Sequence, residues 1–234
     1  MPDRPIPFIA PMVRALLEGR KTQTRRVLNP QPFIDAMGNV ADTDGGGTWL
    51  YGQHPDGRPN WANYLACRFR IAPGDRLWVK EAWRTHKDFD HLKPRELLGH
   101  AEKLGRGVPI WPELSLKSGS AEDRALVKSA GRYRHARFMP RWASSTTLLV
   151  EQVRVQRLQD IGETDSRAEG IGLCVQFYGP PDPDWQHPCL SAREAFATLW
   201  QQLHGPDAWA ANPWVAAITF EVVRANIDAV ERSA

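Results

Sequence analysis

The sequence predicts a small α+β fold that is mostly β, built as a mixed sheet or open barrel with a few short helices. Three observations favour this class. Segments with strand-like alternation are few and far apart in the chain. Turn residues separate them, as at Pro73-Gly74-Asp75. Helical periodicity is short and does not alternate regularly with strands, which argues against a dinucleotide-binding fold.

The N-terminal segment predicts a strand, a helix and a second strand in succession. Residues 5–10 are apolar enough for a short strand, and Pro11 suits the first turn of a helix because its missing N–H costs nothing there. Gly19 is a suitable helix end. Residues 19–26 are rich in cationic and hydroxyl side chains, yet they alternate as a strand would. Two interpretations are open: a solvated basic turn with an edge strand, or a small binding site for an anion or a carbonyl group.

The clearest later element is an amphipathic helix at residues 191–204, with Ser191 as N-cap and Leu203 on the buried face. The other expected elements are strands at residues 64–71, 76–83, 146–155 and 214–223, a hairpin around Trp49 and Tyr51, and short helices at residues 94–104, 121–130 and 163–169.

The organisation expected from this pattern is one domain over residues 1–225, followed by a tail at 226–234. Two stretches, at about 31–64 and 85–131, are rich in Gly and Pro or in charge. We interpret both as insertions into the domain.

The composition is that of a soluble globular protein with unevenly distributed positive charge. Of the 234 residues, 24% are charged and 42% hydrophobic, and the formal net charge is +3. Arginine supplies most of the 30 basic residues, and its planar guanidinium suits phosphates and base edges. Basic clusters at residues 14–26 and 132–141 fit an anionic ligand, although general arginine usage is an alternative explanation. The ten tryptophans are either core residues or flat faces for a base or a sugar.

The cysteines and the hydropathy argue against several classes of protein. Cys67, Cys174 and Cys189 are far apart and form no C-x-x-C pair, which disfavours a disulfide framework and a structural zinc site. We interpret His187 and Cys189 as loop residues rather than metal ligands. No segment has the roughly 18 consecutive apolar residues of a membrane span, and the N-terminus does not resemble a signal peptide. We therefore expect a cytoplasmic protein with no metal, no cofactor and no membrane partner.

A series of short motifs runs through the chain. They are G-R-K-T-Q-T-R-R after the first helix, P-G-D-R-L-W-V-K-E-A-W at Pro73–Trp83, M-P-R-W-A-S at Met139–Ser144, L-Q-D-I at Leu158–Ile161, A-E-G-I at Ala168–Ile171, F-A-T-L-W at Phe196–Trp200 and N-P-W-V at Asn212–Val215. In number and order this set resembles the ASCH domain, a relative of the PUA domain. It is similar to the ASCH-like proteins carried by tailed phages and prophages, over nearly the whole chain except residues 31–64 and 85–131.

The resemblance implies a PUA-like β-barrel with short helices at its rim and a cleft for RNA or a modified nucleoside. Small bacterial members of the family include an amidohydrolase that removes the acetyl group from N4-acetylcytidine. Its catalytic lysine and threonine lie in a G-x-K-T-x-T motif, and its glutamate lies in a downstream helix. The matching positions here are Lys21, Thr24 and Glu169. Other ASCH-like proteins are reported to cleave RNA, so the family does not fix one activity.

Amide hydrolysis is a sensible use of these three side chains. Thr24 would supply a hydroxyl or position a water, Lys21 would accept its proton if burial and neighbouring cations lower its pKa, and Glu169 would protonate the leaving amine. Each also has an ordinary structural alternative, as a turn lysine, a strand threonine and a helix-surface acid. The side chains expected to hold the ligand are Arg20, Thr22, Arg25, Arg26, Arg141 and Trp142, of which the last two are equally consistent with structural anchoring.

Four functions are therefore open. The first is binding of RNA or a modified nucleoside in a basic cleft. The alternatives are an amidohydrolase for N4-acetylcytidine-like nucleosides, a ribonuclease and a phage accessory module that binds a protein. We place binding first because it needs only a cleft and its charges, whereas catalysis needs three side chains to converge.

Overall fold

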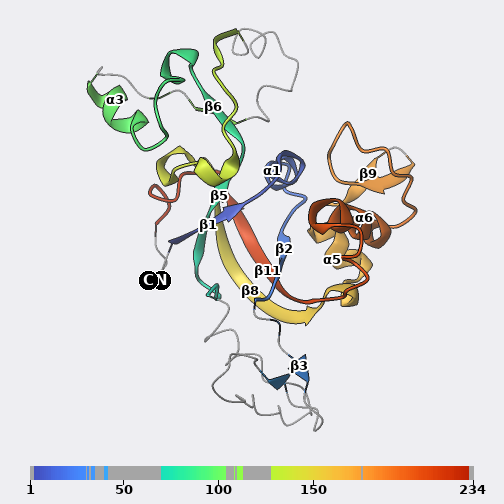
Figure 1. Cartoon of the computed structure of the whole chain (residues 1–234). Coiled ribbons are helices and arrows are strands. Elements are labelled where there is room, and N and C mark those ends of the chain that lie inside the picture. The colour runs from blue at the N-terminus through green and yellow to red at the C-terminus, as the bar shows by residue number, and fades with distance from the viewer. Residues whose placement is uncertain are drawn as a thin grey trace. The chain divides into compact units, whose positions relative to one another are not determined.

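The computed structural model describes residues 3–29, 31, 33–34, 40–41, 70–103, 108, 110–112, 128–174 and 176–231. Its largest sheet is mixed and has the strand order β1-β5-β8-β11-β2 (Figure 1). Within it β1 (Asp3–Pro7) runs parallel to β5 (Arg76–Lys80), and β5 runs antiparallel to β8 (Thr147–Arg157). Likewise β11 (Trp214–Val223) runs antiparallel to β2 (Gln23–Val27).

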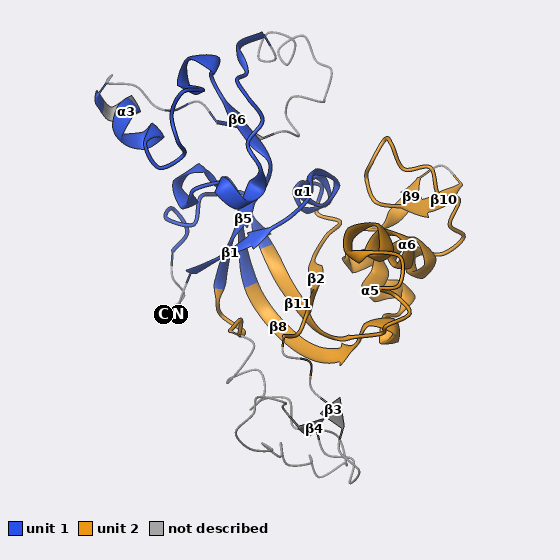
Figure 2. Cartoon of the chain, in the orientation of Figure 1, with its two compact units in different colours: residues 1–18, 76–149, 222–234 blue, residues 19–75, 150–221 orange. Residues whose placement is uncertain are grey.

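The chain divides into two compact units (Figure 2). Unit 1 comprises residues 1–18, 76–149 and 222–234, and unit 2 comprises residues 19–75 and 150–221. Each of the long strands β8 and β11 has residues in both units.

Unit 1 begins with β1 and α1 (Ala10–Leu17), and Pro11 lies in the first turn of this helix as the sequence predicts. α1 buries one face through Met12, Val13, Ala15 and Leu16. A second cluster of buried side chains consists of Trp83, Phe89, Leu97, Met139 and Ala143. Further described elements of unit 1 are β6 (Trp83–Thr85), η1 (Lys87–Phe89), α3 (Leu97–Lys103), β7 (Ile110–Pro112), η3 (Ala136–Phe138) and η4 (Arg141–Ala143).

Unit 2 contains β2 and the helices that support the candidate site. The predicted helix at residues 191–204 is α6 (Ala192–His204), and the Glu194 N–H donates to the hydroxyl of its N-cap Ser191 at 3.1 Å. The Glu163 carboxylate accepts from the Ala192 and Arg193 N–H groups, which ties α5 (Glu163–Ala168) to the start of α6. The other elements are β3 (Phe33–Ile34), β4 (Val40–Ala41), η5 (Leu158–Asp160), β9 (Gly172–Cys174) and β10 (Phe177–Gly179).

Three details differ from the sequence prediction. The strand expected at residues 76–83 splits into β5 and β6, because Trp83 leaves the main sheet and pairs instead with β7 and Arg134. The strand β7 in the insertion was not expected. Leu203, predicted on the buried face of α6, is exposed.

Several predicted elements lie outside the described residues. They are the hairpin around Trp49 and Tyr51, nearly all of the strand at residues 64–71 and most of the helix at residues 121–130.

The class of fold agrees with the prediction at a coarse level: the chain is mixed α and β, with a β-rich sheet and few helices. The strand order leaves β1 and β2 at the edges, and no closed barrel is defined among the described residues. In that same part of the chain, no helix is both long and apolar enough to cross a membrane.

Candidate functional site

Lys21 is the central residue of the candidate site, and a sharp turn after α1 brings the chain to it. Gly19 has a φ of 73°, a left-handed conformation that glycine adopts without strain. Lys21 then forms an antiparallel bridge with Glu169, and the Thr22 N–H donates to the Ala168 carbonyl at 2.9 Å. Two segments far apart in the sequence therefore lie side by side within unit 2.

Glu169 receives one cation at each carboxylate oxygen. Lys21 Nζ lies 2.7 Å from Glu169 Oε2, and Arg25 Nη1 lies 2.9 Å from Oε1. Lys21 Nζ also donates to the backbone carbonyl of Glu169 at 2.8 Å. Glu169 directly follows the last residue of α5, and Gly170 turns the chain away with a φ of 98°. All three charged side chains are buried, with 1–3% of each residue exposed.

Asp165, one helical turn before Glu169, extends these ion pairs into a network. Arg25 Nη2 donates to Asp165 Oδ2 at 2.8 Å, and Arg154 Nη2 donates to the same oxygen at 3.1 Å. We call these five residues, Lys21, Arg25, Arg154, Asp165 and Glu169, the Lys21 network. It holds three cations and two carboxylates, so a net positive charge remains when all are ionised.

The environment of Lys21 disfavours its charged form. Burial is the main cause that lowers the pKa of Lys21, and the charge and hydrogen bond of Glu169 oppose this effect. The positive charges of Arg26 and Arg25 lower the pKa of Lys21 further. A lower pKa increases the fraction of lysine that is unprotonated at a given pH. Only this unprotonated amine can accept a proton, as a general base must.

The other predicted residues of the 19–26 stretch occupy different positions. Thr24 is buried in β2 opposite Ile218, and alternation along the strand puts it on the face opposite to Gln23 and Arg25. In the described residues no hydrogen bond joins Thr24 to the Lys21 network. Thr22 is exposed. Burial lowers the pKa of Arg26, and the charge of Glu169 opposes that shift.

A pocket of about 410 Å³ is lined by residues that flank the Lys21–Glu169 bridge in sequence. Arg167 Nη2 donates to the Tyr178 hydroxyl at 3.1 Å, and the guanidinium carbon lies 5.6 Å from the centroid of that ring. A Cβ at Gly172 would come within 2.9 Å of Arg20 Nη1, so glycine leaves room for this guanidinium. The lining consists of Arg20, Arg167, Ile171, Gly172, Leu173 and Tyr178. We call it the Arg20–Tyr178 pocket; Lys21 and Glu169 do not line it.

Arg141 and Trp142, predicted to bind the ligand, belong to unit 1 and make structural contacts there. Arg141 Nη2 lies 2.7 Å from Asp3 Oδ2 and 2.5 Å from Asp228 Oδ1. These hydrogen bonds raise the pKa of Arg141. Trp142 is half-buried and packs against the cluster around Trp83 and Met139.

Sequence reasoning missed several residues of the site. Asp165 and Arg154 belong to the network, and Arg167 and Tyr178 belong to the pocket. The spacing of Asp165 and Glu169 was an available signal, because residues four apart share one face of a helix. No comparable signal existed for Tyr178, which comes close to Arg167 only through the pairing of β9 and β10.

Within the described ranges, no three His, Cys, Asp or Glu side chains gather as a metal-binding cluster. The chain matches no family model, no curated protein and no solved structure. The resemblance to ASCH domains therefore stays a prediction that is carried by the motifs alone.

Proposed function

We propose that the chain is an ASCH-like protein that binds RNA or a modified nucleoside in the Arg20–Tyr178 pocket of unit 2. One observation carries the proposal: two guanidinium groups, a tyrosine ring and two aliphatic side chains line one pocket, and the lining residues flank the Lys21–Glu169 bridge in sequence. A nucleoside presents a flat apolar face and polar edges, and a nucleotide adds a phosphate. The lining offers a partner for each of these groups.

The roles of the lining residues follow from their chemistry. Tyr178 and the side chains of Ile171 and Leu173 would contact the faces of the base. Arg20 and Arg167 would donate to a phosphate or to acceptors on the base edge. While Lys21 is protonated, the net positive charge of the Lys21 network would favour an anionic ligand further.

The test is a calorimetric titration with cytidine, N4-acetylcytidine, cytidine monophosphate and a short RNA. Arg167→Ala and Gly172→Ala should each weaken binding about tenfold or more, the first by removing a donor and the second by displacing Arg20. Arg95→Ala is the matched control, because Arg95 is an exposed arginine of unit 1. Undiminished affinity in both pocket variants, or no affinity for any of the four ligands, would reject the proposal.

A second function, amidohydrolysis of an N4-acylated cytidine, is favoured by the 2.7 Å contact between Lys21 Nζ and Glu169 Oε2. In the state with neutral Lys21 and protonated Glu169, Lys21 can take a proton from the attacking water. The water oxygen bonds to the acyl carbon, the carbon–nitrogen bond breaks, and Glu169 gives its proton to the leaving amine. A proton transfer across the same contact then restores the starting state, and the products are cytidine and acetic acid, which releases its proton to the solvent.

Mass spectrometry separates this activity from simple binding. Lys21→Met should abolish the loss of the acetyl group while nucleoside affinity remains, and Thr24→Ala tests whether a hydroxyl is the nucleophile. Circular dichroism checks that both variants are folded. Wild-type turnover in Lys21→Met would refute catalysis by this lysine. Shortened RNA among the products would identify a ribonuclease. A partner protein that is still captured after nuclease treatment, together with no affinity for nucleosides, would favour the accessory-module alternative.

A further inference from the structure

A stretch of unit 1 far from the pocket in sequence exposes cationic and aromatic side chains together. Arg132, Tyr133, Arg137 and Phe138 are exposed, and the two aromatic residues keep 51% and 52% of their accessible surface. The sequence contains no acidic residue between positions 128 and 142. Neither the Lys21 network nor the Arg20–Tyr178 pocket uses any of these side chains.

The backbone beneath these side chains is held by the buried Arg134. Arg134 and Trp83 exchange backbone hydrogen bonds of 2.9 and 3.1 Å. The guanidinium of Arg134 donates to the carbonyls of Phe89 and Leu92 at 3.1 and 3.2 Å. Asp90 directs its carboxylate to this anchor, accepting from the Arg132 N–H and lying 4.0 Å from Arg134 Nη2. The exposed side chains therefore stand on a fixed backbone, which reduces the entropy lost on binding.

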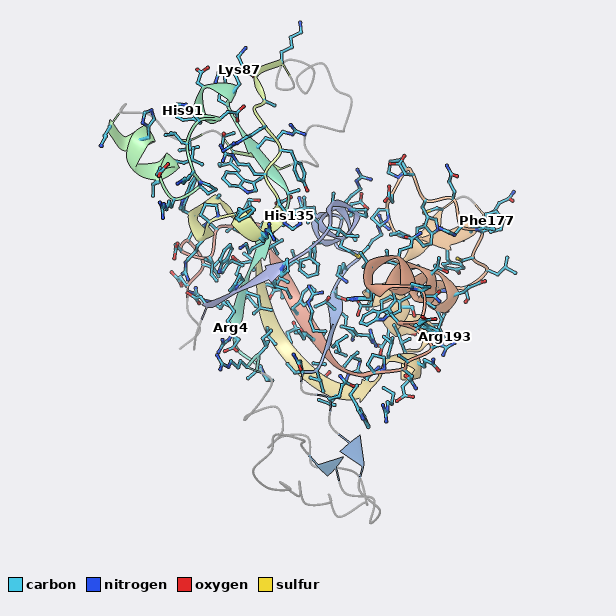
Figure 3. All side chains as sticks on the ribbon, in the orientation of Figure 1. Arg4, Lys87, His91, His135, Phe177 and Arg193 are labelled. Carbon is cyan, nitrogen blue, oxygen red and sulfur yellow. The ribbon has the colours of Figure 1, made fainter. Side chains whose placement is uncertain are left out.

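Each exposed ring has a guanidinium beside it. The guanidinium carbon of Arg137 lies 4.6 Å from the Phe138 centroid, and that of Arg84 lies 5.8 Å from the Tyr133 centroid. His135, labelled in Figure 3, caps the short helix η3 by accepting from the Arg137 N–H at 3.1 Å. This cap fixes the backbone at the position from which the Arg137–Phe138 pair projects.

We propose that this surface, the 132–138 face (Arg84, Arg132, Tyr133, Arg137 and Phe138), binds single-stranded nucleic acid. Aromatic rings stack on bases of any sequence, and neighbouring guanidinium groups bind the phosphates between them. A single strand offers both features at once, whereas a duplex covers the faces of its bases. The 132–138 face is separate from the nucleoside pocket, and its activity does not depend on the function proposed for unit 2.

Fluorescence anisotropy with labelled oligo(dT) and oligo(U) of about 12 nucleotides tests the proposal, because single-strand sites span about 4–16 nucleotides. Tyr133→Ala and Phe138→Ala should each weaken binding by about fivefold to a hundredfold. Arg137→Ala should also weaken it, and should reduce the slope of log affinity against log salt by about 0.7 if one phosphate contact is lost. These side chains are exposed, so their truncation leaves the packed core intact.

Two matched controls come from the same unit. Leu98→Ala removes an exposed apolar side chain and Arg95→Ala an exposed arginine, both outside the 132–138 face, and neither should change affinity. The proposal is overturned if the wild type binds no single strand, if the aromatic variants bind as well as the wild type, or if a matched duplex binds as tightly as the single strand. Loss of binding in Arg167→Ala but not in Tyr133→Ala would assign the affinity to the pocket, and so would reject this surface while supporting the function proposed for unit 2.

Discussion

Glu169 in unit 2 and Glu81 in unit 1 are buried to nearly the same extent, with 3% and 4% of each residue exposed, yet their surroundings differ. Glu169 receives Lys21 and Arg25 at its two carboxylate oxygens. Glu81 follows β5, and in the described part of the chain its carboxyl has no cationic partner. Burial raises the pKa of Glu81 to about 7. Burial alone thus pushes a carboxyl toward its neutral form, and only a partner of opposite charge makes a buried carboxylate a stable part of the fold.

The difference between Glu169 and Glu81 suggests that the paired charges around Glu169 serve a function. The Lys21 network keeps three charged side chains buried in unit 2, those of Lys21, Arg25 and Glu169, although buried ion pairs seldom stabilise a fold more than apolar residues of the same size would. A cost of that kind is common at functional sites, where pKa values are displaced to suit a reaction or a ligand. The comparison therefore supports the choice of this region as the candidate site.

Removing Glu169 should have the largest effect. Glu169→Ala leaves both Lys21 and Arg25 without the carboxylate, and we expect the free energy of unfolding to fall by about 3–5 kcal/mol. Urea denaturation at neutral pH measures this loss. Glu169→Gln keeps the shape and should lose less. At the same pH, Glu81→Ala should cost far less than Glu169→Ala, since no ion pair is broken; equal losses would contradict the contrast between the two carboxyls.

The pH dependence of the free energy of unfolding should reveal the contribution of Glu81. Its pKa is raised in the folded chain from 4.5 to about 7, so folding favours the protonated form. Stability from this group is complete below pH 4.5, falls as the pH rises, and is lost above about pH 7, a change of about 3 kcal/mol. Glu81→Gln cannot ionise and should lack this part of the decline. Thermal denaturation from about pH 4 to about pH 8 measures the difference, and parallel curves for the two proteins would show that Glu81 is not the titrating group.

Local sequence patterns predicted many helices and strands, because helix-start residues and strand alternation act within a single segment of the chain. Pro11 set the start of α1, and Ser191 set the start of α6. The strand predicted at residues 214–223 is β11 with the same limits. The split after Lys80 was not predictable in this way, because the pattern of residues 76–83 stays strand-like while Trp83 changes its pairing partners. Pairing partners are a property of the tertiary structure and leave no local signature.

The candidate site was also only partly predictable from the sequence, because its contacts depend on the tertiary structure. The motif resemblance selected Lys21 and Glu169, and the structure brings their side chains into contact. Charge clustering alone treated Arg25 and Arg141 as equivalent, but Arg25 joins the Lys21 network whereas Arg141 pairs with Asp3 and Asp228. The sequence gives the number of charged residues in a segment, but the tertiary structure decides which residues of opposite charge form ion pairs with them.

Removing the ion pairs of Arg141 should have the smallest effect on the free energy of unfolding, in contrast to the large loss expected for Glu169→Ala. The Arg141 side chain is 37% exposed, and Asp3 keeps its bidentate pairing with Arg76 when Arg141 is removed. We expect Arg141→Ala to lower the free energy of unfolding by less than about 1 kcal/mol, because exposed ion pairs are screened by solvent and salt. Its affinity for oligo(dT) should also stay within about twofold of wild type, whereas Arg137→Ala weakens binding. A loss of affinity in Arg141→Ala as large as that in Arg137→Ala would mean that the guanidinium leaves its two carboxylates to bind phosphate, and the nucleic-acid surface would then extend from the 132–138 face to η4.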